Sequence, residues 1–162
     1  MGSMKREKRI DYITKQLGIK MRVFDPHPDR KEADEYSGEP EDCGVRCICR
    51  LTNIDYESVY NILIEYMKKH FLNTMMYKKM LIEAMESSFH LNIYDLYDKK
   101  LSLGEFMHTH KKGRYIISID HHMLTYINGT WYDSEDIFLI ADLLIPQRVE
   151  TVICEMKYAK YL

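Results

Sequence analysis

The segment HMLTYINGTWYD, residues 122–133, predicts a β-hairpin and sets the fold class of the chain. Its central Asn-Gly pair, residues 128–129, suits a type I′ turn, in which both central residues have a positive φ. The flanking residues are β-branched and aromatic, as strands favour. A two-residue turn at this place pairs Ile127 with Thr130, which fixes the register of the two strands.

The same register brings two polar side chains to one face of the hairpin. It places Asp133 opposite Leu124, and because side chains alternate along a strand, His122 and Asp133 become diagonal neighbours on one face. His121 points to the opposite face. We therefore expect Asp133 to accept a hydrogen bond from the His122 ring and to fix its tautomer, so that the second ring nitrogen can act as a base.

Helical patterns fill most of the chain before this hairpin. Apolar spacing and capping residues predict helices over residues 5–17, 43–51, 55–69, 74–87 and 102–111. Strands are predicted over residues 21–24, 115–119 and 149–156, while residues 137–145 fit either a helix or a strand. Helices first and strands later predict an α+β fold, with N-terminal helices packed on a C-terminal antiparallel β-sheet.

Composition indicates one globular domain. The chain has 162 residues, of which 46% are hydrophobic and 30% charged. We assign the domain to residues 4–162 and interpret residues 1–3 as an expression-vector scar. Residues 25–42 hold three of the four prolines and dense charge, which predicts a surface loop.

The same numbers exclude several classes of partner. A formal net charge of −2 gives no reason to expect nucleic acid. No apolar run approaches the roughly 20 residues that span a bilayer, so we expect no membrane partner. Four cysteines are too few for a disulfide scaffold in a chain of this length, which favours a reducing, cytoplasmic setting.

Cys43 is the residue whose local setting points to chemistry. It follows Asp42 at the start of a predicted helix, directly after the charged loop. Unpaired N–H groups and the positive end of the helix dipole stabilise a thiolate at such a position, and a thiolate is the nucleophilic form of cysteine. Cys47, Cys49 and Cys154 are interpreted as small buried hydrophobes.

Two stretches resemble the papain-like cysteine peptidases. EDCGVRCICRLTNIDYESVY, residues 41–60, is similar to the Asp-Cys-Gly start of the peptidase domains of bacteriocin exporters, and also to small, uncharacterised papain-like proteins of bacteria and phages. SLGEFMHTHKKGRYIISIDHHMLTYINGTWYDSED, residues 102–136, resembles the second block of those small proteins. Laid on that block, the family's histidine falls on His122 and its acid on Asp133, in agreement with the register.

This resemblance implies a papain-like fold and a cysteine hydrolase, either a peptidase or an amidase. Cys43, His122 and Asp133 would form the catalytic triad, with an acyl-thioester intermediate and a peptide or protein as substrate. No cofactor is implied. The sequence does not distinguish hydrolysis from acyl transfer, and it says nothing about the oligomeric state.

One feature of the family is missing. Papain-like peptidases place a glutamine before the cysteine as an oxyanion-hole donor, whereas residues 36–42 contain neither Gln nor Asn. The backbone N–H of Cys43 is one replacement donor, and Ser37 or Gln16 is the second. Asp42 and Trp131 are candidates for the substrate cleft, although Trp131 can equally pack the sheet.

Two other interpretations are alternatives to the hydrolase hypothesis. The first alternative is a metal site built from histidines and cysteines. None of these residues has the spacing of a zinc motif, so we expect no metal. They are His108, His110, His121, His122, Cys43, Cys47 and Cys49. The second reading is a non-catalytic papain-like binding module with a vestigial triad, which the missing glutamine favours.

Overall fold

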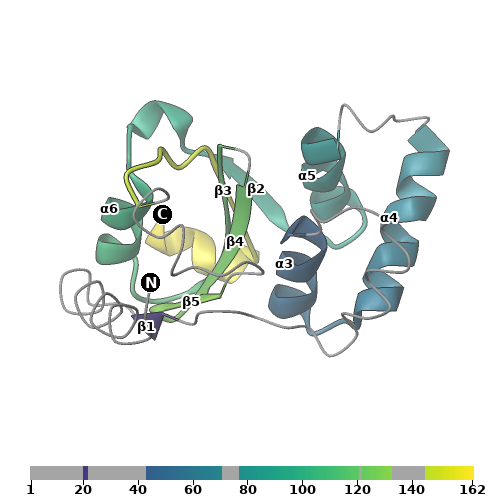
Figure 1. The fold of residues 1–162 in the computed structure, drawn as a ribbon, viewed down its shortest axis with the longest axis horizontal. Helices are drawn as coiled ribbons and strands as arrows, with labels where there is room; N and C mark the ends of the chain where they lie inside the picture. Colours follow the sequence, from purple (N-terminus) through teal and green to yellow (C-terminus); the bar gives the residue numbers. More distant parts are fainter. Residues whose placement is uncertain (1–19, 22–42, 71–76, 121, 133–144) are drawn as a thin grey trace, which may run out of the picture.

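The computed structural model describes residues 20–21, 43–70, 77–120, 122–132 and 145–162 (Figure 1). In chain order their helices and strands are β1 (Lys20–Met21), α3 (Cys43–Thr52), α4 (Tyr56–His70), α5 (Tyr77–Ser87), β2 (Asn92–Asp95), α6 (Leu103–Thr109), β3 (Arg114–Ile119), β4 (His122–Ile127), β5 (Thr130–Tyr132) and β6 (Thr151–Cys154). Short 3₁₀ helices cover Tyr97–Lys99 and Met156–Tyr161.

The described strands form one sheet in the order β1-β5-β4-β3-β6-β2. Neighbours from β5 to β2 run antiparallel, and the edge strand β1 pairs in parallel with β5. Helices and a largely antiparallel sheet make an α+β fold, which confirms the predicted class at that level.

The predicted hairpin is present in the predicted register. Ile127 pairs with Thr130, and the connecting residues Asn128 and Gly129 both have positive φ, 45° and 84°. The Asn128 side chain also accepts a hydrogen bond of 3.0 Å from the Gly113 backbone N–H, which anchors the turn to the start of β3. The local Asn-Gly chemistry therefore decides this part of the sheet.

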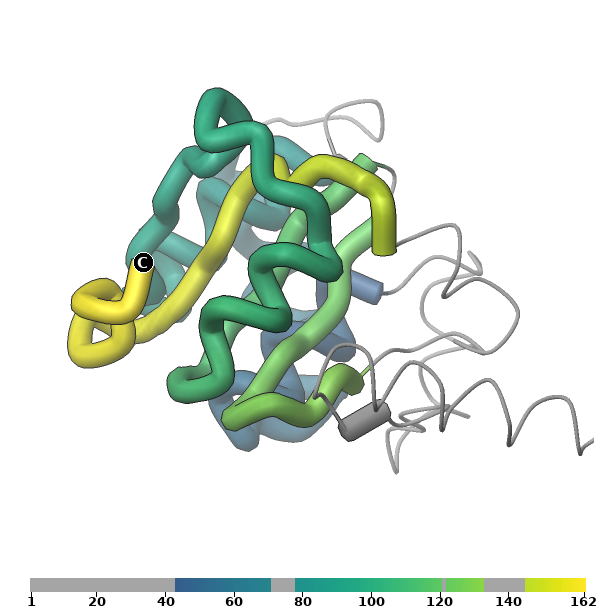
Figure 2. Tube along the Cα trace, turned by 90° about the vertical axis from the view of Figure 1, so that its left-hand side faces the viewer, coloured from purple at the N-terminus to yellow at the C-terminus, as the bar shows by residue number. Residues whose placement is uncertain are grey.

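The sheet separates two apolar cores (Figures 1 and 2). On one face, α6 and the C-terminal 3₁₀ helix cover the core that contains Leu124, Tyr126 and Trp131. On the other face, α3, α4 and α5 pack over a second core, to which the sheet contributes Ile116, Met123 and Ile153. Neighbouring residues of β4 alternate between these cores, as the pleat of a strand requires.

Two helix caps follow the predicted chemistry. The Asp55 carboxylate accepts a hydrogen bond of 3.0 Å from the Ser58 backbone N–H at the start of α4. Ser102 accepts one of 3.1 Å from the Glu105 backbone N–H, and the Glu105 side chain returns the interaction, which completes a capping box.

One predicted strand is shorter in the structure, and one strand of the structure was not predicted. The last strand is confined to β6, because the backbone N–H of Val149 bonds instead to Leu101 and Met156 already begins a 3₁₀ helix. Strand β2 was not predicted, since its four side chains show no alternation of burial. The helix before it, α5, is described from Tyr77 onwards.

Several predictions lie outside the described residues. They are the helix over residues 5–17, residues 22–24 of the first strand, the charged loop over 25–42 and most of the ambiguous segment over 137–145. Within the described part of the chain, no helix is both long enough and apolar enough to cross a membrane.

Candidate active site

Cys43 is the first residue of α3, as predicted. It is half-buried, with its side chain against the core under α3, whereas the other three cysteines, Cys47, Cys49 and Cys154, are buried. All four are free thiols. Cys43 is therefore the cysteine that combines access to solvent with a helix N-terminus.

Close packing holds the N-terminal end of α3 against α5. A β-carbon at position 44 would lie 2.5 Å from Cδ1 of Leu81, so only glycine allows this approach. Gly44 directly follows Cys43, and Leu81 itself is buried. The thiol-bearing residue is thus next in sequence to a close contact between two helices.

The opposite end of α3 is tied to the sheet. The Arg114 guanidinium donates a hydrogen bond of 3.2 Å to the carbonyl oxygen of Leu51, in the last turn of α3. The Arg50 guanidinium lies 4.7 Å from the ring centroid of Tyr132 on β5, a cation–π distance. Arg114 thus supplies a donor at a helix C-terminus, where carbonyls lack intrahelical donors.

The anchoring also fixes the direction of α3 along β4. Arg114 is paired with Ile127, at the end of β4 farthest from His122. Because the C-terminus of α3 lies at that end and α3 packs on β4, its N-terminus with Cys43 extends toward the end of the strand that begins with His122. The helix rises about 10 Å between Cys43 and Arg50, most of the length of β4.

His122 begins β4 and is half-buried. It pairs with Ile119, the last residue of β3, so it lies at the mouth of the β3–β4 turn. Strand alternation places it on the face of Leu124 and Tyr126, the face covered by α6, while Met123 points to the face of α3. To meet the Cys43 thiol, the imidazole has to extend past the end of the strand pair.

The remaining predicted site residues are not among those that the structure describes. They are Asp133, Asp42, Ser37 and Gln16; His121, which was predicted to point to the face opposite His122, is also outside the described residues. The described ladder of β4 and β5 ends at the pair Thr125 and Tyr132, one residue before Asp133.

Trp131 takes the second of the two roles that its sequence position allows. It is fully buried and belongs to the core under α6, so it packs the sheet and does not line an open cleft. Its pairing with Tyr126 explains this position, because both side chains point to the same face of the hairpin.

Two other side chains of the sheet that can lose a proton, the Cys154 thiol and the Tyr126 hydroxyl, are too deeply buried to act as nucleophiles. It raises the pKa of the Cys154 thiol to about 11, with the nearby Glu155 adding to the effect. Burial also raises the pKa of Tyr126 to about 12. Groups that stay protonated this far above neutral pH cannot supply an anionic nucleophile.

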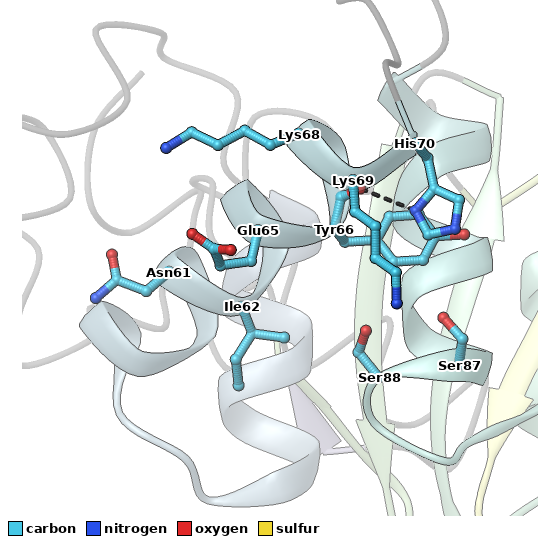
Figure 3. Close-up of a pocket in the computed structure, with 9 residues that line it drawn as sticks. All are labelled: Asn61, Ile62, Glu65, Tyr66, Lys68, Lys69, His70, Ser87 and Ser88. Atoms are coloured by element: carbon cyan, nitrogen blue, oxygen red, sulfur yellow. Dashed lines mark hydrogen bonds between the residues drawn. The ribbon is translucent and has the colours of Figure 1, made fainter.

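A surface groove of about 850 Å³ lies between α4 and α5 (Figure 3). Its wall includes the Tyr66 and His70 rings, stacked with centroids 4.1 Å apart, and the two lysines that precede His70. These cations belong to the last turn of α4, where positive charge complements the helix dipole. Neither Cys43 nor His122 lines the groove, and no motif in the sequence indicated it.

No family model, curated protein or solved structure matches the chain. The fold and the placement of Cys43 and His122 are therefore the basis for a functional interpretation. Among the described residues, no three His, Cys, Asp or Glu side chains gather closely enough to hold a metal ion.

Proposed function

We propose that this protein is a papain-like cysteine hydrolase, a peptidase or amidase with Cys43 as nucleophile, His122 as general acid and base, and Asp133 as the group that orients His122. One observation carries the proposal. The half-exposed cysteine is the first residue of the helix that packs on β4, and β4 begins with a histidine.

The proposed reaction uses the ordinary chemistry of a thiol and an imidazole. His122 takes the proton of the Cys43 thiol, and the thiolate attacks the carbonyl carbon of an amide. The backbone N–H of Cys43 donates to the oxyanion, with Ser37 or Gln16 as the second donor. His122 then protonates the leaving amine, and water hydrolyses the acyl-thioester.

The direction of α3 supports this assignment. Because Arg114, opposite the last residue of β4, bonds to the C-terminal turn of α3, the N-terminus of α3 extends toward the end of β4 where His122 lies. A helix that ran the other way would separate the thiol and the imidazole by most of the length of the strand. The buried positions of the other cysteines leave Cys43 as the thiol open to a substrate.

The proposal extends to the substrate and the setting. We expect a peptide or protein substrate, no cofactor, and neither nucleic acid nor membrane as partner. Four free thiols fit a reducing compartment, and we propose the cytoplasm.

Site-resolved alkylation tests the assignment. Iodoacetamide is added to the folded protein at pH 6 to 9, and mass spectrometry measures the rate at each cysteine. We expect Cys43 to react well below pH 8 and at least about tenfold faster than the three buried cysteines. His122→Ala should slow Cys43, whereas the adjacent His121→Ala should leave its rate unchanged.

Turnover requires a second measurement. Incubation with a peptide library, followed by mass spectrometry, should show cleavage products with the native chain and none with Cys43→Ala. Slow and equal alkylation of all four cysteines would overturn the enzyme assignment. A fast Cys43 without any cleavage would favour the binding module, for which the absence of Gln and Asn from residues 36–42 is the supporting observation.

A further inference from the structure

A lysine on α5 reaches the end of β3. The Lys78 ammonium donates a hydrogen bond of 2.9 Å to the carbonyl oxygen of Ile119 and forms an ion pair of 2.8 Å with the Glu150 carboxylate. The two side chains are 39% and 30% exposed. An ion pair with this much solvent contact contributes little to the free energy of unfolding, so its main effect is on geometry.

The acceptor of this hydrogen bond belongs to the turn that leads to His122. Ile119 is the last residue of β3 and pairs with His122, with two residues between them. Glu150 is joined to the same strand, because its backbone N–H donates a hydrogen bond of 2.9 Å to the Ser118 carbonyl. Lys78 therefore connects α5 to the last two residues of β3, directly before the β3–β4 turn.

The same helix also contacts the residue that follows Cys43. Leu81 lies one turn after Lys78, on the same side of α5, and its Cδ1 atom packs against Gly44. One helical turn of α5 therefore contacts both the residue after the proposed nucleophile and the end of the strand that leads to the histidine. Any shift of the β3–β4 turn relative to this helix changes the distance between the imidazole and the thiol.

We propose that Lys78 is a positioning residue, which holds the β3–β4 turn so that the His122 ring extends past the strand end to Cys43. This inference rests on the proposed function. Lys78 does not touch the substrate, and it acts only through His122. The two charged groups of the contact are Lys78 on α5 and Glu150, which directly precedes β6.

The test measures the alkylation rate of Cys43 as a function of pH in four variants. Lys78→Met removes both contacts and should slow Cys43 about tenfold at pH 7, with the reactive limb of the profile moved to higher pH. Lys78→Arg keeps a donor and should restore most of the rate. Glu150→Gln weakens the ion pair but leaves the hydrogen bond to Ile119, and should slow Cys43 about threefold. The matched control is Lys79→Met, since Lys79 is exposed on the same helix.

A double variant separates positioning from general loss of structure. In the His122→Ala background, Lys78→Met should cause no further loss of rate, because the residue acts through the imidazole. Additive losses would overturn the inference, as would a native rate in Lys78→Met while His122→Ala is slow. If His122→Ala itself labels at the native rate, the proposed function fails first and this inference with it.

Discussion

A β-carbon on residue 44 would lie 2.5 Å from Cδ1 of Leu81, closer than two non-bonded carbon atoms approach. Both residues are buried, and Gly44 follows the proposed nucleophile directly. The close packing of α3 on α5 is therefore located next to Cys43, at the N-terminus of α3.

We expect Gly44→Ala to destabilise the protein by about 1–3 kcal/mol, because the added methyl group displaces a buried side chain. Leu81→Ala should cost about 2–5 kcal/mol through the cavity that it leaves. In the double variant the new methyl group occupies part of that cavity, so the combined loss should be smaller than the sum. Urea unfolding measures all three values, and strictly additive losses would contradict the contact.

Arg114→Met should destabilise the protein by about 1 kcal/mol or more, since it removes the donors that reach Leu51 and Arg50 at the end of α3. Thermal and urea unfolding measure the change. Arg148→Met is the matched control: that guanidinium lies 4.6 Å from the ring of Tyr97, which is 49% exposed, and its loss should change stability by less than about 0.5 kcal/mol. Equal effects of the two substitutions would refute an anchoring role for Arg114.

Gly113, directly before β3, and Gly129, in the β4–β5 turn, should respond differently to alanine. Gly129 has a φ of 84°, and a β-carbon there would make only an ordinary contact of 3.8 Å with the Lys111 carbonyl oxygen, so Gly129→Ala should cost only the conformational energy of about 1–2 kcal/mol. Gly113 has a φ of 114°, and a β-carbon there would also overlap the Tyr115 ring. Gly113→Ala should therefore be clearly more destabilising, and the reverse order in urea unfolding would show that the turns are misassigned.

The Cys154 thiol should make stability fall in alkaline solution. Its pKa is raised by burial from about 9 in the unfolded chain to about 11 in the fold, so the folded state holds the proton more tightly. This contribution is complete below pH 9 and is lost as the pH rises toward 11, by up to about 2 kcal/mol. Unfolding under reducing conditions between pH 8 and 10 measures the slope, which should be shallower in Cys154→Ala. An unchanged slope would show that the thiol is not the cause.

Local chemistry explains what the sequence could predict. Asn128 and Gly129 specify their turn without outside help, and Asp55 and Ser102 cap helices through neighbours three residues away. The same holds for Cys43, because a helix N-terminus is visible in the residues around it.

Contacts between distant segments explain what could not be predicted. Strand β1 has two residues, and its parallel pairing with β5 joins positions more than a hundred residues apart. The partners that place the candidate site are equally remote in sequence: Arg114 reaches Leu51, and Lys78 reaches Ile119. No spacing rule links such pairs, since each depends on how the helices pack on the completed sheet.

The two-sided sheet has a practical consequence for spectroscopy. Trp131 is the chain's single tryptophan and is fully buried on the α6 face. Its emission should therefore be blue-shifted in the native protein and should report on the loosening of that face. Far-ultraviolet circular dichroism follows chiefly the helices of the opposite face, so together the two signals show whether the halves of the molecule melt in one step or in two.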